Sequence, residues 1–151
     1  MFKLLLERGA KPQLLSDASI YPLHEAAAHD AAEFAAALID AGAETNLANQ
    51  LGFAPLHAAC REGHVAVVEL FIARGARLDL ADEYGFTPMH EAAENGHLAV
   101  AKLLGAARAP AAAPLTRAYQ NLTVGTTPLD LAKKNGHTKV ADYLRSLKQP
   151  Y

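Results

Sequence analysis

The sequence predicts an all-α solenoid, built from repeated helix-turn-helix units that are joined by β-hairpin-like loops. A proline-led motif returns along the chain as Pro22-Leu23-His24, Pro55-Leu56-His57, Pro88-Met89-His90 and Pro128-Leu129-Asp130. A Gly-His pair follows the last three of these prolines at a constant spacing of eight residues. A period of about 33 residues is typical of stacked repeats, in which each unit buries its apolar face only against its neighbours.

Each unit is predicted to begin its first helix at the motif proline, because the first helical position has no intrahelical N–H bond to lose. Thr87 and Thr127 precede two of these prolines and are suited to cap the helix. Tyr21 and Ala54 stand where a threonine is expected. We therefore predict weaker helix starts there, and a higher melting temperature for Ala54→Thr.

The second helix of each unit is predicted from runs such as residues 65–72, which are apolar nearly all round. That pattern suits a helix packed between neighbours on both sides. Gly63, Gly96 and Gly136 permit the left-handed turn between the two helices. Asp30 replaces this glycine in the first full unit, which we expect to be the softest internal one.

These columns resemble the ankyrin family, whose repeat carries a Thr-Pro-Leu-His signature, a Gly-His between its helices and a Gly-Ala before a hairpin loop. The last feature is supplied by Gly9-Ala10, Gly42-Ala43 and Gly75-Ala76. The resemblance implies a single domain over residues 1–151. Its expected parts are a half repeat at 1–16, repeats at 17–49, 50–82 and 83–115, and a C-terminal capping repeat at 123–151.

A loop insertion is predicted within residues 105–125, because the spacing of the motif prolines grows from 33 to 40 residues there. Prolines in its Ala/Pro-rich segment exclude a continuous helix. Insertions in repeat proteins fall in loops, often on the binding face. Two interpretations stay open: a tolerated surface insertion, or a partner-specific finger that uses Arg117 and Tyr119.

The two ends of the chain differ in character. The first residues align with a second helix, so Phe2 and residues 4–6 lack their usual cover. Since a terminal repeat needs a polar outer face, we expect either further repeats upstream or contact with another chain at this end. Basic residues around the final helix pair predict a C-terminal cap.

Composition narrows the classes of function. A net charge of −2 gives no general attraction for nucleic acid or anionic membranes, and no apolar run approaches the roughly 20 residues of a membrane span. Cys60 is the only cysteine, which excludes an intrachain disulfide and favours a reducing compartment. We therefore expect a cytoplasmic chain, with the nucleus as the alternative.

The seven histidines do not form a pattern that predicts catalysis or metal binding. Six of them occupy two repeat columns, and the resemblance implies that His24, His57 and His90 hydrogen-bond the turns joining adjacent repeats. His57, Cys60 and His64 lack a fourth zinc ligand, and no nucleophile–base arrangement or phosphate-binding loop stands out. We predict no catalytic site, no cofactor and no metal, and keep a histidine-based metal or ligand protein as the least favoured alternative.

The resemblance implies that the chain binds a protein or peptide through the concave face formed by hairpin tips and first helices. At the tips the implied residues are Ile20, Leu51, Phe53, Glu83, Tyr84 and Phe86. On the first helices they are His29, Arg61, Glu62, Glu94 and Asn95. The alternative function is a targeting or regulatory segment of a larger enzyme or effector protein.

The apolar and aromatic tip residues are expected to face solvent and to anchor a partner, because large aromatic residues are favoured in interfaces. Glu62, Glu83 and Glu94 flank them with acid. The alternative is that Phe53 and Phe86 pack on the neighbouring hairpin. The sharper hypothesis is a groove for a segment that combines apolar anchors with basic residues.

Overall fold

The computed structural model of the chain describes Arg8 and residues 21–147. The expected half repeat at 1–16 and the expected tip residue Ile20 lie outside the described residues. The described helices are α2 (Pro22–Ala28), α3 (Ala32–Asp40), α4 (Pro55–Glu62), α5 (Val65–Ala73), α6 (Pro88–Glu94), α7 (Leu98–Ala106), α8 (Pro128–Lys134) and α9 (Thr138–Ser146).

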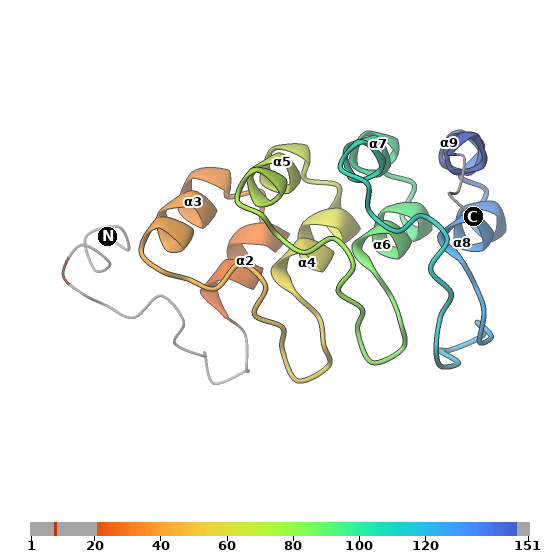
Figure 1. Ribbon diagram of the computed structural model, residues 1–151, viewed down its shortest axis with the longest axis horizontal. Helices are drawn as coiled ribbons and strands as arrows, with labels where there is room; N and C mark the ends of the chain where they lie inside the picture. Colours follow the sequence, from red (N-terminus) through yellow and green to blue (C-terminus); the bar gives the residue numbers. More distant parts are fainter. Residues whose placement is uncertain (1–7, 9–20, 148–151) are drawn as a thin grey trace.

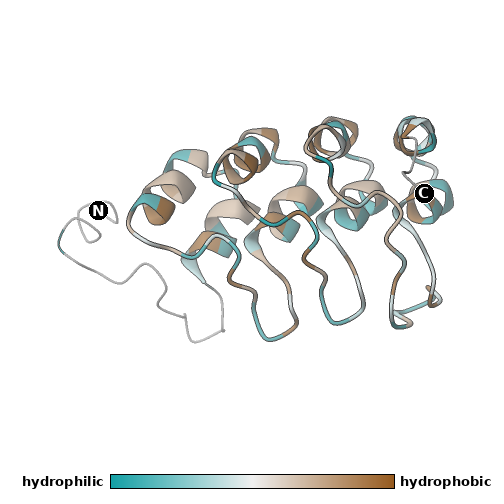
Figure 2. Ribbon diagram, viewed as in Figure 1, coloured by the Kyte–Doolittle hydropathy of each residue, from teal (hydrophilic) through white to brown (hydrophobic). Residues whose placement is uncertain are grey.

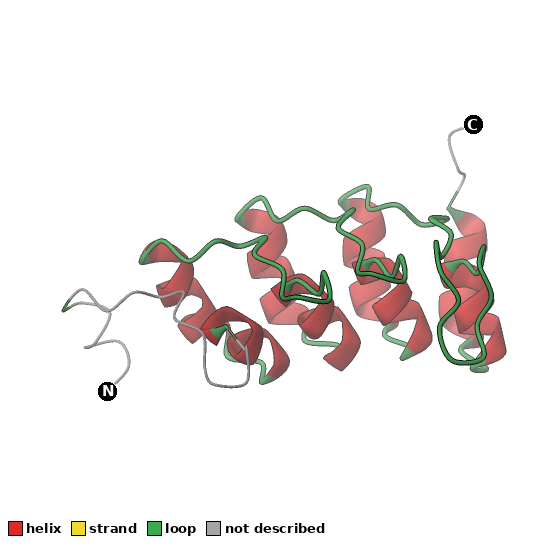
Figure 3. Cartoon of the chain, turned by 90° about the horizontal axis from the view of Figure 1, so that it is seen from below, coloured by secondary structure: helices red, strands yellow, loops and turns green. Residues whose placement is uncertain are grey.

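The helices form two parallel rows, and each unit adds one helix to each row (Figure 1). The first helices α2, α4, α6 and α8 make one row, and the second helices α3, α5, α7 and α9 make the other. The connecting loops project away from the helices on one side (Figures 1 and 3). Within residues 21–147 the only β pairing is an isolated bridge between Tyr119 and Leu122. The predicted all-α solenoid is confirmed.

The apolar core is one continuous cluster of buried residues drawn from every helix from α2 to α9, and the hydrophobic parts of the ribbon lie largely on these helices (Figure 2). Leu38, Phe71 and Leu104 are fully buried residues of α3, α5 and α7, and each lies one repeat from the next. The first helices contribute buried alanines such as Ala59 and Ala92. Small side chains let the first-helix row pack closely, and larger buried residues of the same row, Leu56 and Met89, fill the core together with those of the second row.

At these helix starts the side chain at the third helical position takes part in the cap, so the residue before the proline does not form it alone. At α4 and α6, Nδ1 of His57 and His90 accepts the backbone N–H of Ala54 and Thr87, at 3.0 and 3.1 Å. The Thr87 hydroxyl donates to His90 Nδ1 and does not bond the helix backbone, contrary to the capping role predicted for it. Thr127 does accept from the backbone N–H of Asp130, as predicted.

Two histidine columns tie each unit to its neighbours in opposite directions. Nε2 of His24 and of His57 donates forward to the carbonyls of Phe53 and Phe86, at 2.8 and 2.9 Å, and His90 reaches Thr126 at 3.4 Å. The implied role of the signature histidines is confirmed. The second column, His64, His97 and His137, donates backward to the carbonyls of Ala28, Arg61 and Glu94.

The left-handed turns persist where the glycine is missing. Asp30 adopts φ 54° between α2 and α3, in the column where Gly63 and Gly96 have φ 79° and 76°. Arg108 adopts φ 63° after α7, in the column of Gly42 and Gly75. A residue with a Cβ is less stable in this conformation than glycine. Tertiary packing therefore imposes the turn at these two positions.

The insertion folds back on the preceding hairpin tip. Residues 107–127 connect α7 to α8, whereas residues 74–87 connect α5 to α6. The backbone N–H groups of Thr116 and Arg117 donate to the carbonyl of Tyr84, at 2.9 and 3.2 Å. Leu115 and Leu122 lie buried against Phe86 and Leu131 in a small second core. The insertion is therefore an ordered wall of the molecule.

Candidate partner-binding groove

A groove of about 720 Å³ runs across the tips of the second and third full repeats to the insertion. It is lined by Asn49, Leu51, Phe53, Arg61, Asp82, Glu83, Tyr84, Phe86, Glu91, Glu94, Asn95, Tyr119 and Gln120. These residues come from two hairpin tips, the first helices α4 and α6, the residue after α6, and the insertion. A smaller hollow of about 180 Å³ adjoins it toward α2 and shares Asn49, Phe53 and Arg61 with it.

The two hairpin tips are shaped by one side chain each. Asn49 Oδ1 accepts the backbone N–H groups of Leu51 and Phe53, at 2.9 and 3.1 Å. Asp82 Oδ1 accepts those of Tyr84 and Phe86, at 2.9 and 2.8 Å. Such side-chain to backbone bonds fix a tight turn. The apolar residues of each tip are therefore held on a rigid loop.

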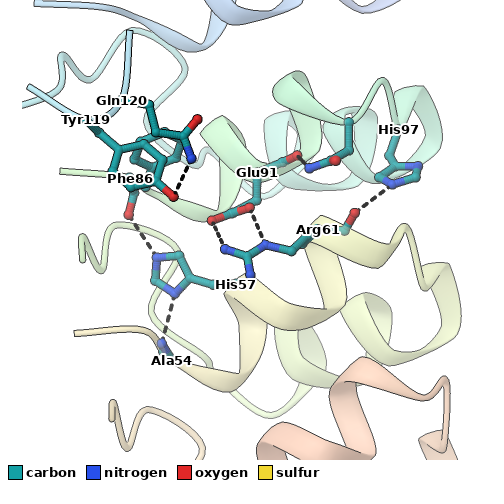
Figure 4. Close-up of polar contacts among 9 residues, drawn as sticks. Ala54, His57, Arg61, Phe86, Glu91, His97, Tyr119 and Gln120 are labelled. Atoms are coloured by element: carbon teal, nitrogen blue, oxygen red, sulfur yellow. Dashed lines mark hydrogen bonds and ion pairs between the residues drawn. The ribbon is translucent and has the colours of Figure 1, made fainter. Parts of the chain in front are cut away.

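Arg61 and Glu91 form a bidentate ion pair that links α4 to α6 across the floor of the groove (Figure 4). Nε and Nη2 of Arg61 each lie 3.0 Å from a Glu91 oxygen. The Glu91 side chain is 2% exposed and that of Arg61 is 49% exposed. The guanidinium also lies over the Phe53 ring, 4.4 Å from its centroid. Arg61 and Phe53 therefore form a ridge between the two hollows.

The electrostatics of the pair follow from its burial. Removal from water raises the pKa of Glu91, although the hydrogen bonds from Arg61 oppose this shift. Those same bonds raise the pKa of Arg61. We take the carboxylate to be ionised at neutral pH, since a bidentate guanidinium faces it. The acidic side chains left to face a ligand are then Asp82, Glu83 and Glu94.

The sequence comparisons agree with this geometry. The family model described as ankyrin repeats in three copies matches residues 1–82 and residues 23–113. The chain belongs to the ankyrin-repeat family. No curated protein matches the chain significantly. Ankyrin repeats generally mediate protein–protein interaction and are typically not catalytic. Among the described ankyrin helices, none is long and apolar enough to cross a membrane.

Most of the predicted partner-contacting residues meet on one face of the ankyrin solenoid. Those in the large groove are Leu51, Phe53, Arg61, Glu83, Tyr84, Phe86, Glu94, Asn95 and Tyr119. Glu62 lines the smaller hollow. His29 and Arg117 are exposed and line neither. Whether these side chains contact a partner stays a prediction.

The expectation that Phe86 faces solvent is wrong. Its side chain is 3% exposed, because the insertion covers it with Leu115, Leu122 and the ring of Tyr119. The Tyr119 ring meets Phe86 edge-on, with centroids 5.6 Å apart. Phe53 and Tyr84 are half-buried, and Leu51 is exposed, at 55%. Phe86 therefore supports the groove wall and offers little surface to a partner.

Four residues that line the groove were not predicted from the sequence. They are Asn49, Asp82, Glu91 and Gln120. Asn49 and Asp82 are one period apart, and an Asx residue beginning each tip is a signal that sequence could have given. The position of Gln120 depends on how the insertion folds, which periodicity does not determine. The burial of Glu91 depends on Arg61, thirty residues earlier.

Six of the seven histidines hydrogen-bond a neighbouring unit of the ankyrin scaffold, whereas His29 is exposed beside Glu25. Both ring nitrogens of His57 are bonded, Nδ1 to Ala54 and Nε2 to Phe86. Desolvation lowers the pKa values of His24, His57 and His90, the last to about 4. Cys60 is fully buried, which raises the pKa of its thiol. In the described part of the chain, no three His, Cys, Asp or Glu residues are placed to hold a metal ion.

Proposed function

We propose that this ankyrin module binds a segment of another protein in the groove between its hairpin tips, first helices and insertion. The observation that carries the proposal is the position of Leu51. This leucine is 55% exposed at the mouth of the groove and belongs to neither apolar cluster of the described core. A large apolar side chain held in water on a rigid tip gains free energy when a partner covers it.

The charges of the groove favour a partner that brings basic residues with its apolar anchor. Asp82, Glu83 and Glu94 line it, while Arg61 is already paired with Glu91. Charge complementarity of this kind contributes to specificity and to the rate of association. The insertion limits the groove at its C-terminal side, where Tyr119 and Gln120 form the wall.

The test is selection of random peptides displayed on phage against the chain, followed by affinity measurement on matched variants. Leu51→Asp should weaken the selected peptides strongly, because a charge replaces the exposed anchor. Val65→Asp is the matched control, since Val65 is also an exposed aliphatic residue, at 37%, but lies on the second-row helix α5. Equal effects of the two substitutions, or no effect of Leu51→Asp, would contradict the proposed groove.

A further inference from the structure

Acidic side chains line both hollows, on either side of the Arg61–Phe53 ridge. Glu25 and Glu62 line the smaller hollow, and Asp82, Glu83 and Glu94 line the larger. Glu25 has a local partner in His29, whose Nε2 lies 3.4 Å away. Within residues 21–147, Glu62 and Glu94 have no ion pair, although Arg61 lies close enough to feel both charges. Each hollow therefore offers at least one carboxylate to a ligand cation.

The ridge itself offers hydrogen-bond donors. An arginine has five N–H donors, and Glu91 uses two of those on Arg61. About half of the Arg61 side chain is exposed, and the Phe53 ring and Glu91 hold its guanidinium in place. The remaining donors can reach a backbone carbonyl of a segment that crosses the ridge.

The spacing of the two hollows sets the spacing of the ligand cations. Glu62 ends α4 and Glu94 ends α6, and these are neighbouring helices of the same row. The axes of packed helices lie about 8–10 Å apart, so carboxylates at the ends of two neighbouring helices are separated by a distance on the order of 10 Å. A polyproline II segment rises about 3.1 Å per residue and returns to the same face every three residues, so its side chains three apart are separated by roughly 9 Å. That conformation has no internal hydrogen bonds, so its carbonyls are free to accept from Arg61.

We propose that the groove takes an extended, polyproline-II-like segment with two Lys or Arg side chains three residues apart, one on each side of Arg61. One basic side chain lies with Glu62 and the other with Glu94. A carbonyl between them accepts from the Arg61 guanidinium, and an apolar residue of the segment covers Leu51. This inference rests on the proposed function and adds the chemical class and the spacing of the partner residues.

The first experiment asks what the selected peptides share. Random peptides displayed on phage are selected on the full chain, and their sequences are compared with the unselected library. We expect enrichment of Lys or Arg pairs separated by three positions. Peptides that are lost with Leu51→Asp but show no excess of such pairs would overturn this inference and leave the proposed function standing. Failure to enrich any peptide would count against both.

The second experiment asks whether each carboxylate contacts its own cation. Glu62→Gln and Glu94→Gln should each weaken a selected peptide by about 1.5- to fivefold, the range for exposed ion pairs. Replacing one basic peptide residue by Gln should abolish the effect of one substitution and keep that of the other, which a double-mutant cycle measures. Glu69→Gln, at an exposed site on α5, is the control and should change nothing. Equal weakening by Glu69→Gln, or no coupling in either cycle, would contradict the inference.

Discussion

The guanidinium of Arg61 holds both carboxylate oxygens of Glu91, each at 3.0 Å, and so joins the first helices of two neighbouring repeats. Because Glu91 is buried and Arg61 is half-exposed, one pair serves two purposes. It neutralises a charge beneath the groove, and it sets a fixed cation at the boundary of two acidic hollows.

Arg61→Ala should destabilise the fold at neutral pH by roughly 2 kcal/mol. The loss of one partner leaves a buried charge unpaired, but water that reaches the half-exposed site keeps the cost below the roughly 3–5 kcal/mol of a fully buried pair. Urea unfolding, followed by circular dichroism, measures this loss of stability. Exposed Arg77, which pairs with Asp79, is the control, and Arg77→Ala should leave the midpoint unchanged.

The cost of Arg61→Ala should also depend on pH. Burial already raises the pKa of Glu91, and removal of the guanidinium raises it further, so the folded variant takes up a proton at a higher pH than the unfolded chain. Its destabilisation is then largest above that pKa and shrinks as the pH falls. A cost that stays constant from neutral to mildly acidic pH would contradict this account of the pair.

Phe86→Ala and Phe53→Ala should differ in stability, although the two residues occupy the same repeat column. Phe86 is buried beneath the insertion, so its truncation should cost about 3–5 kcal/mol. Phe53 is half-buried, and its truncation should lower the free energy of unfolding by about 1–2 kcal/mol. Comparison of the two unfolding midpoints measures the difference. Similar costs would mean that the insertion does not cover Phe86 in solution.

His90 should stay neutral in the folded chain well below the ordinary histidine pKa. Desolvation lowers its pKa to about 4, whereas an unfolded histidine titrates near about 6.5. The stability that depends on the neutral ring is therefore present above about pH 6.5 and is lost as the pH falls toward about 4. Titration of the imidazole resonances by NMR tests this prediction. Half-protonation of His90 above about pH 6 would be inconsistent with the buried ring.

Ala54→Thr should raise the melting temperature. Thr87, at the equivalent position one repeat later, donates its hydroxyl to His90 Nδ1 at 2.9 Å, and Ala54 has no hydroxyl to donate to His57. One added hydrogen bond stabilises a fold by about 1 kcal/mol. Ala54→Val is the matched control, because it has the shape of threonine without the donor. An unchanged or lower melting temperature for Ala54→Thr would show that the two positions are not equivalent.

Periodicity predicted the helices, and the resemblance to ankyrin repeats implied the histidine bonds, because both are repeated features of one backbone. The positions of His24, His57 and His90 in a single column indicated their common role, and each donates to the loop of the next unit. The all-α solenoid and the ankyrin family followed from the same columns. Structural roles that recur in each repeat can therefore be predicted from the sequence.

Features that depend on contacts outside the repeat could not be predicted from the sequence. Phe86 was expected at the surface because its column should face solvent, with packing on the neighbouring hairpin as the alternative, and only the folded insertion distinguishes it from Phe53. The role of Thr87 was predicted from the general preference of threonine for capping. Its hydroxyl instead donates to Nδ1 of His90, three residues later, which also accepts the Thr87 backbone N–H. Glu91 was missed because its burial requires Arg61 from the preceding unit.

The most direct test of the groove is to map a selected peptide onto the isotope-labelled chain by NMR. We expect the largest shift changes on the amides of Leu51, Phe53, Tyr84, Glu94 and Asn95, with little change on the second-row helices α5 and α7. Changes concentrated on α5 and α7, with the hairpin tips unaffected, would contradict binding of the partner in the proposed groove.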